Sequence, residues 1–342
     1  MTRDGGDLLE LPFDQYQRYS VTAQLLAELH VEPGARLLDV GGGPGPIERF
    51  VPDHVAFVAD LEKSRDGLYV NASGAALPFR TGSFSAVVTF DTLEHVFPED
   101  RHSFVQELQR VSHDVVILTA PFQDPDVELA EAALAEFFAL RFNVPHPMLA
   151  EHLQFGLPNL DEVERAFRDG GWATATLPSG LLSRWLAMML LHEELRANNL
   201  PQLGKLHAYY NSAVGPSDCR DPAYRHVIIA SRVRAESELR AAADALRSPE
   251  HAPAASSAFH AIASAVFAQR VGTVVRSSET VALETELDAL RRQVADLERQ
   301  VADRDAHLIE LRVLNEKLLA GRRPVSARVA DRLSDWWKGR RL

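Results

Sequence analysis

The sequence predicts an α/β protein built on a doubly wound, mostly parallel sheet of seven strands, followed by a helical connector and a coiled coil. Two observations predict the sheet. Short apolar segments alternate with helical ones through the first 233 residues, and the first of them runs directly into a glycine-rich loop. Alternating strands and helices imply a sheet with helices on both faces. A heptad repeat that begins at Leu283 predicts the coiled coil.

The expected elements follow in order along the chain. A helix over 14–30 precedes the first strand, and strands are expected at 35–40, 55–60, 67–71, 84–90, 114–120, 172–177 and 225–233. A helical insertion at 123–157 follows the fifth strand, and a further helix is expected from Asn159 to Asp169. A second insertion, at 178–224, follows the sixth strand and contains an apolar helix from about 181. Ligands of such sheets bind at the carboxyl ends of the strands, so we expect both insertions to cover the site and select the substrate.

The glycine loop reads LLDVGGGPG from Leu37 to Gly45. Its glycines Gly41, Gly43 and Gly45 alternate, and a loop without Cβ atoms lets the backbone approach a ligand closely. Pro46 stands where a dinucleotide fingerprint needs its third glycine. The spacing therefore argues against a dinucleotide fingerprint, and an NAD-dependent oxidoreductase is a distant third alternative.

An acidic residue, Asp60, ends the second expected strand, where its carboxylate would accept hydrogen bonds from the two hydroxyls of a ribose. Further on, the chain reads ALPFRTGSFSAVVTFDTLEHV from Ala76 to Val96. The glycine loop, the acid-ended strand, LPF and LEHV, in this order, resemble the class I S-adenosylmethionine (SAM)-dependent methyltransferases, in particular the type 11 group. The resemblance is strong over 35–122 and looser to about 233. It implies a Rossmann-like methyltransferase sheet and SAM as the cofactor.

The resemblance also implies which residues bind the cofactor: Asp39, Gly41, Gly43, Gly45, Asp60, Leu61, Ser73, Ala75 and Asp91. Asp39 would fix the glycine loop and accept from the ligand's ammonium group; alternatively, it only caps the following turn. Two positions depart from the family's pattern. Ser73 replaces an acid that often binds the adenine amino group, and Ser85 stands where the family often has aspartate.

Asp91, Glu94 and His95 form a D-x-x-E-H pattern. In a helix this spacing would bring the three side chains onto one face. The pattern resembles the E-x-x-E-H metal site of some O-methyltransferases, and two carboxylates with an imidazole suit Mg²⁺, Mn²⁺ or Zn²⁺. The resemblance thus admits a divalent metal, although we do not expect one. Otherwise His95 lines the site or acts as a general base, and His152 in the first insertion is the second candidate catalytic residue.

These observations predict a SAM-dependent methyltransferase that works by in-line methyl transfer, with O-methylation of a small molecule or a lipid-linked glycan hydroxyl as the leading reaction. The acceptor inference rests on analogy with enzymes that modify surface polysaccharides. The alternative is a coiled-coil scaffold or interaction protein whose methyltransferase-like domain is inactive, an alternative that Ser73 and Ser85 favour.

The composition of the chain excludes some classes of partner and cellular compartment. A net charge of −12 over 342 residues argues against nucleic acid as a partner. The only cysteine, Cys219, excludes an intramolecular disulfide. The N-terminal residues lack the apolar core of a signal peptide, and there is no run of 18 apolar residues. We therefore expect a cytoplasmic protein, with peripheral contact at the inner face of the membrane as an option.

Five domains are expected: an N-terminal helical cap (1–33), the methyltransferase domain (34–233), a helical connector (234–275), the coiled coil (276–319) and a basic amphipathic tail (320–342). Nine of the eleven core heptad positions between Leu283 and Leu318 are apolar, which favours a parallel dimer, with Asn315 fixing the register. A helix packed on its own domain is the alternative. The segment from Gly321 has a charge of +5 and tryptophans, so it could bind a membrane or an acidic partner, or remain solvated.

Overall fold

The computed structural model describes residues 7–43, 45–62, 68–198 and 202–249. The chain divides into two units, 1–268 and 269–342, and all of the described residues belong to the first. The predicted coiled coil at 276–319 and the basic tail at 320–342 lie outside the described residues, and so does most of the predicted connector.

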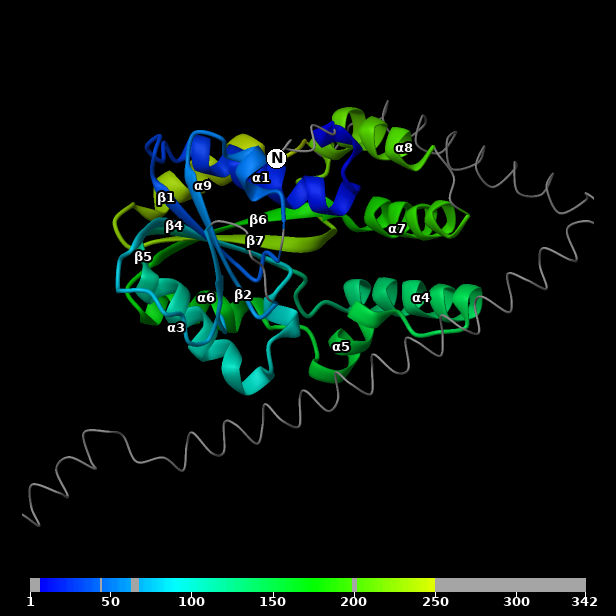
Figure 1. Cartoon of the computed structure of the whole chain (residues 1–342), viewed down its shortest axis with the longest axis horizontal. Coiled ribbons are helices and arrows are strands. Elements are labelled where there is room, and N and C mark those ends of the chain that lie inside the picture. The colour runs from blue at the N-terminus through cyan, green and yellow to red at the C-terminus, as the bar shows by residue number, and fades with distance from the viewer. Residues whose placement is uncertain (1–6, 44, 63–67, 199–201, 250–342) are drawn as a thin grey trace, which may run out of the picture. The chain divides into compact units, whose positions relative to one another are not determined.

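The described residues form one seven-stranded sheet, shown in Figure 1. Its strands are β1 (Arg36–Val40), β2 (Val55–Asp60), β3 (Tyr69–Asn71), β4 (Phe84–Phe90), β5 (Ser112–Ala120), β6 (Ala173–Leu181) and β7 (Ala223–Ser231). The strand order is β3-β2-β1-β4-β5-β7-β6, parallel from β3 to β5, with β7 antiparallel to both of its neighbours. The predicted doubly wound, mostly parallel seven-stranded sheet is confirmed.

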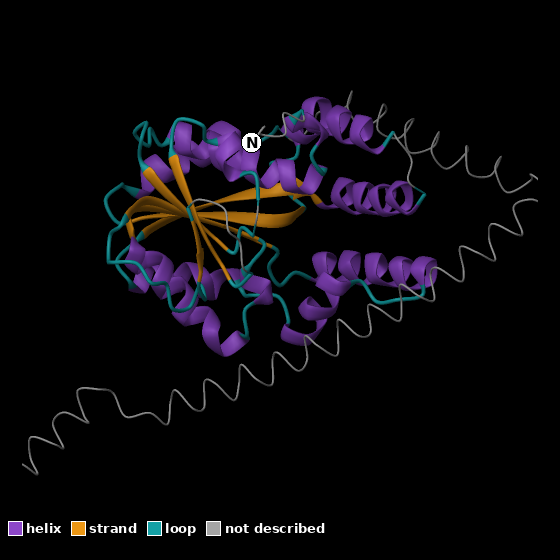
Figure 2. Cartoon of the chain, viewed as in Figure 1, coloured by secondary structure: helices purple, strands orange, loops and turns teal. Residues whose placement is uncertain are grey.

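Helices cover both faces of the sheet (Figure 2). Successive strand residues point to opposite faces, so Leu37 and Leu38 belong to two separate cores. One core includes buried side chains of α1 (Phe13–Glu28), α2 (Ile47–Phe50) and α9 (Glu236–Leu246). The other includes side chains of α3 (Arg101–Val111) and α6 (Leu160–Asp169). The helix α9 lies in the predicted connector and packs on the sheet through Leu239.

The two insertions contain four further helices: α4 (Pro125–Phe142), α5 (Pro147–Phe155), α7 (Leu182–Ala197) and α8 (Leu203–Tyr209). They follow the carboxyl ends of β5 and β6 and lie together at one end of the sheet (Figure 1). Their apolar side chains form a third core, which also contains Phe13 at the start of α1. The chain just before α1 joins them too, because Asn211 donates to the carbonyl oxygens of Leu9 and Leu11.

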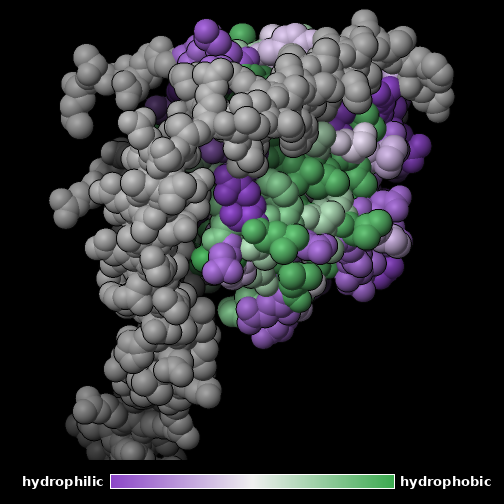
Figure 3. All heavy atoms as spheres, turned by 90° about the vertical axis from the view of Figure 1, so that its right-hand side faces the viewer, coloured by the Kyte–Doolittle hydropathy of each residue, from purple (hydrophilic) through white to green (hydrophobic). Residues whose placement is uncertain are grey.

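Short turns complete the described chain: 3₁₀ turns η1 (Leu8–Glu10), η2 (Leu93–His95), η3 (Pro98–Asp100) and η5 (Gly215–Ser217), and a π-turn η4 (Tyr210–Val214). The sixth strand is longer than expected, because β6 keeps pairing with β7 as far as Leu181 opposite Ala223. Several large side chains of α4 and α5 are exposed, including Leu140 at 81% and Leu153 at 74%. Figure 3 shows hydrophobic residues gathered at the end of the sheet that bears the insertions. None of the described helices has the length and apolarity that a membrane span requires.

Candidate active site

The glycine loop leaves β1 through two glycines with different roles. Gly41 has a φ of +80°, and a Cβ there would overlap the side chain of Thr92. Gly41 therefore permits close packing against the turn that follows β4. Gly43 has a φ of +51°, but a Cβ on it would meet no atom of the described residues within 4 Å. The backbone at Gly43 thus faces open space, where a ligand can approach it.

Asp60 ties the glycine loop to the end of β2. The Gly43 amide donates to Oδ2 of Asp60 at 2.9 Å, and the Glu62 amide donates to Oδ1 at 2.7 Å. Leu61, which lies between these contacts, is 51% exposed. The predicted ribose-binding carboxylate and the predicted loop are therefore adjacent, at the carboxyl edge of the sheet.

The carboxylate of Asp39 is buried at the end of β1. It is 1% exposed, and neither of its oxygens has a hydrogen-bond partner within the described part of the chain. Burial raises the pKa of Asp39 to about 8; Arg18 opposes this shift and the charge of Asp60 adds to it. The loop covers this carboxylate closely, because a Cβ on Gly42 would overlap it. Such a group is stabilised by a cation brought by a ligand.

The remaining predicted cofactor residues lie around this edge. Ser73 follows β3 and is exposed, and its hydroxyl accepts from the amide of Ala75 at 3.3 Å. A Cβ on Gly45 would overlap the hydroxyl of Tyr19, so the end of the loop packs against α1. These contacts hold Gly45 and the Ser73–Ala75 turn near the ends of β1 and β3.

Asp91 is held by arginines. Its carboxylate accepts from Nε of Arg225 at 2.7 Å and lies 3.2 Å from Nη1 of Arg18. Asp14 of α1 pairs with both arginines, and although its own burial opposes the shift, their charges hold the pKa of its carboxyl at about 2. Arg225, Arg18 and Asp14 were not predicted from the sequence as site residues. The available signal in the sequence was a charged residue, Arg225, within the apolar segment that forms β7.

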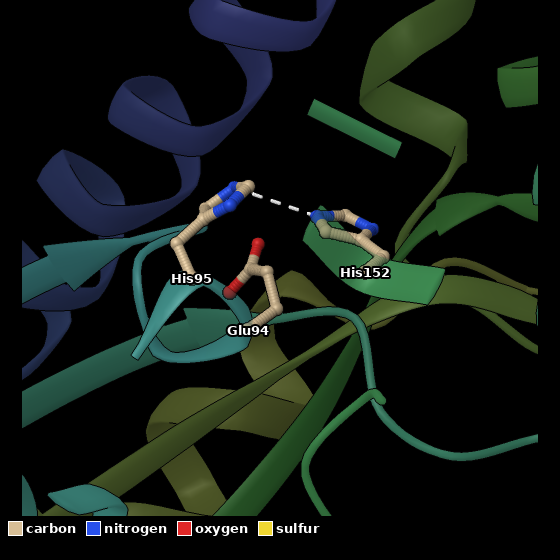
Figure 4. Close-up of side chains that lie close together, drawn as sticks. All are labelled: Glu94, His95 and His152. Atoms are coloured by element: carbon tan, nitrogen blue, oxygen red, sulfur yellow. Dashed lines mark hydrogen bonds between the residues drawn. The ribbon is translucent and has the colours of Figure 1, made fainter. Parts of the chain in front are cut away.

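The helical face expected for Asp91, Glu94 and His95 does not form. Asp91 has a φ of +45°, and only Leu93–His95 form a 3₁₀ turn, η2. The structure instead brings Glu94 and His95 together with His152 of α5, and potential metal-binding atoms of these three side chains all lie within 4.8 Å of one another. Figure 4 shows the carboxyl group of Glu94 extending toward the space between the two rings.

Each histidine in this cluster is oriented by a glutamate. Nδ1 of His95 lies 2.7 Å from Glu151, and Nδ1 of His152 lies 2.8 Å from Glu131. The two Nε2 atoms face each other at 3.4 Å (Figure 4). Thus the two candidate catalytic histidines are neighbours, although they are 57 residues apart in sequence.

Glu94 completes the cluster as a fully buried carboxyl group. It is 0% exposed, and its oxygens have no hydrogen-bond partner among the described residues. Burial, and then the charge of Asp91, raise its pKa well above the usual range. Sequence reasoning gave Glu131 no role. The signal was its position on the buried stripe of α4, beside Val127, Ala130 and Leu134.

Part of the chain is similar in sequence to known methyltransferases. Residues 38–117 match the family model described as a methyltransferase domain. An uncharacterized methyltransferase from Mycobacterium tuberculosis strain H37Rv is 34% identical over 94 residues, an alignment that covers 22% of this chain and 37% of that protein. The match therefore spans little more than a third of the relative's length.

Solved structures match this chain with low TM-scores. The YcgJ protein from Bacillus subtilis has a TM-score of 0.38 at 14% identity, covering 63% of this chain and 99% of its own. Magnesium protoporphyrin IX methyltransferase from Synechocystis, solved with S-adenosylhomocysteine, has a TM-score of 0.40 at 13% identity, covering 64% and 84%. The strand order, rather than these scores, establishes the fold. Together, the sheet and the match over residues 38–117 identify a methyltransferase domain in the described part of the chain.

Proposed function

We propose that the protein transfers a methyl group from SAM to an oxygen of a small molecule or a glycan. One observation carries the proposal: the buried carboxylate of Asp39, which has no hydrogen-bond partner among the described residues, lies beneath a glycine loop that is tied to Asp60. SAM bears an ammonium group and a ribose, which are the groups that Asp39 and Asp60 would hold. When bound, SAM would supply an electrophilic methyl group.

The histidine pair supports an oxygen acceptor. Methyl transfer needs the acceptor placed in line with the methyl group, and a hydroxyl acceptor must also lose its proton. Carboxylates accept hydrogen bonds, so the Nδ1 atoms that contact Glu151 and Glu131 carry the protons. Each Nε2 is then left with a lone pair that can take the proton of a hydroxyl. His95 lies after the carboxyl end of β4, at the same edge of the sheet as the glycine loop that follows β1.

The proposal includes two partners besides the acceptor. A second copy of the chain would pair through the heptads at 276–319, and the basic tail at 320–342 would meet an anionic membrane face. The heptad pattern and the +5 charge of the segment from Gly321 support them. A lipid-linked glycan would be the acceptor that suits such a location.

Calorimetry with SAM and S-adenosylhomocysteine tests the proposal first. The full-length protein should bind both at micromolar concentrations. Asp60→Ala should weaken binding by roughly 1.5–3 kcal/mol for each lost ribose hydrogen bond. Asp53→Ala is the matched control, because Asp53 is an exposed acid just before the same strand.

Labelled SAM then tests methyl transfer to hydroxyl-bearing small molecules and lipid-linked sugars. Product with the wild type, and its loss in Asp60→Ala, would support the enzyme. If the folded wild-type protein binds neither SAM nor S-adenosylhomocysteine, the scaffold alternative takes the place of this proposal.

A further inference from the structure

We propose that Glu94, His95 and His152 form a zinc site at the carboxyl edge of the sheet. The residues come from two separate elements, since Glu94 and His95 lie in η2 and His152 lies in α5. Contacts between α5 and η2 bring them together. Asp91, which belonged to the possible metal ligands of the sequence pattern, is excluded because its carboxylate is held by Arg225.

The hydrogen bonds of the two rings leave both Nε2 atoms as electron-pair donors. Glu151 and Glu131 fix the Nδ1 atoms of His95 and His152 at 2.7 and 2.8 Å. Glu131 is itself held, because the same oxygen accepts from the hydroxyl of Tyr224 at 2.7 Å. Metal-binding histidines typically donate their other ring nitrogen to a carboxylate in this way, which fixes the tautomer and the ring orientation.

The separation of the two Nε2 atoms fits one shared cation. They lie 3.4 Å apart, and two lone pairs facing each other at this distance repel unless a positive charge lies between them. Two nitrogens bound to one tetrahedral zinc at the usual 2.0–2.1 Å are about 3.3–3.4 Å apart. A proton shared between the rings is the rival explanation.

Glu94 favours the metal over the proton. A shared proton would give each ring a hydrogen-bond partner but would give none to Glu94. The oxygens of Glu94 are buried and have no partner within the described chain. A buried carboxylate without a donor is costly, whereas a metal ion would take it as a third ligand. Two imidazoles and one carboxylate suit zinc better than Mg²⁺ or Ca²⁺, which prefer oxygen ligands.

Three protein ligands leave one tetrahedral position open. The role of the metal, though not its binding, rests on the proposed function. An acceptor hydroxyl bound at the open position would have a lowered pKa, so that it could lose its proton to water near neutral pH. The histidines would then act as ligands of the metal, and the metal would take over the activation of the acceptor.

Metal titration of the full-length protein tests the site. Protein stripped with a chelator should bind one zinc ion per chain in calorimetry, and Co²⁺ in its place should give the visible absorption bands of a tetrahedral site. His152→Ala and Glu94→Gln should lower zinc affinity at least tenfold. Glu131→Gln should lower it by about 10- to 100-fold, as loss of a carboxylate behind a ligating histidine does. His102→Ala, on the exposed side of α3, is the control and should bind zinc as the wild type does.

Melting curves of each variant show whether it is folded. If Glu94→Gln does not fold, the zinc affinity of His152→Ala tests the site. No zinc binding by the wild type at micromolar concentrations would overturn the proposal, as would equal affinities of wild type and folded His152→Ala. SAM binding, measured on the same samples, separates the two proposals. SAM binding without zinc binding would refute only the metal site, and zinc binding without SAM binding would refute only the proposed function.

Discussion

Arg225 of β7 binds Asp91, the residue that follows β4, through Nε at 2.7–2.8 Å and Nη2 at 2.6 Å. The side chain of Arg225 is only 3% exposed, and its Nη2 also pairs with Asp14 of α1. One guanidinium therefore links the antiparallel strand, the turn after β4 and the first helix. Since β5 lies between β4 and β7, the link spans a strand.

Arg225→Met should destabilise the protein strongly. The change would leave Asp91 with the 3.2 Å contact to Arg18. Asp14 would keep a 3.4 Å contact to Arg18 and a 3.3 Å hydrogen bond from Nε1 of Trp185. Breaking a buried pair on one side costs about 3–5 kcal/mol, and urea unfolding would measure it. Arg240→Ala is the control. It breaks a surface ion pair with Glu236, in which the Arg240 side chain is 69% exposed, and it should lower the free energy of unfolding by less than about 1 kcal/mol. Equal effects of the two changes would contradict the linking role of Arg225.

The free energy of unfolding should fall as the pH rises from about 4 to 8, through Asp39. Its pKa is about 8 in the folded protein, against an ordinary value of 3.8. Between these values the unfolded chain has lost a proton that the folded protein retains, so rising pH favours unfolding. Asp39→Asn removes this contribution. The stability of the Asn variant relative to wild type should therefore increase from pH 5 to pH 8, as measured by urea unfolding at each pH. A constant difference would contradict the raised pKa.

Alanine at two positions of the glycine loop should have different effects. Gly41→Ala adds a Cβ that overlaps Thr92 at a φ of +80°, so it should destabilise the fold by more than the roughly 1–2 kcal/mol of a left-handed residue alone. In Gly43→Ala the added Cβ meets no atom of the described residues, so the loss of folding free energy should be limited to that backbone strain. SAM binding should still weaken, because the new methyl group occupies the open side of the loop. Thermal melting and calorimetry distinguish these outcomes. Unchanged SAM affinity in Gly43→Ala would show that the ligand does not approach there.

Removal of the residues after 275 should convert a dimer to a monomer that still binds SAM. The sheet closes with β7 at Ser231, and the last described helix, α9, ends at Leu246, so the truncated chain keeps every described element. Sedimentation of the full-length and truncated proteins at tens of micromolar measures the change. A full-length monomer under these conditions would contradict the heptad pairing.

The sheet could be predicted because its strands leave a local signal. The predicted ranges 55–60 and 84–90 coincide with β2 and β4, since the strands of a parallel sheet are short apolar runs bounded by turns. The glycine loop and Asp60 were also local signals, and the backbone places them where the motif implied. Helical periodicity failed at Asp91, because a positive φ there separates it from the turn that contains Glu94 and His95.

The histidine cluster could not be assembled from the sequence. His95 and His152 were each singled out, but nothing local states that residues 57 apart will face each other. The partners of Asp91 are equally remote, since Arg225 is 134 residues away. Such contacts depend on how α5 packs on η2 and how β7 inserts beside β5, which are properties of the whole fold.

The third core has a consequence for engineering acceptor choice. Phe13 packs with side chains of both insertions, its amide donates to Nδ1 of His207 at 3.0 Å, and Asn211 holds the carbonyls of Leu9 and Leu11. Grafting residues 123–157 and 178–224 onto a related sheet would break these bonds. A working chimera must therefore carry residues 7–16 with them, so the beginning of the chain is inherited with the insertions rather than with the sheet.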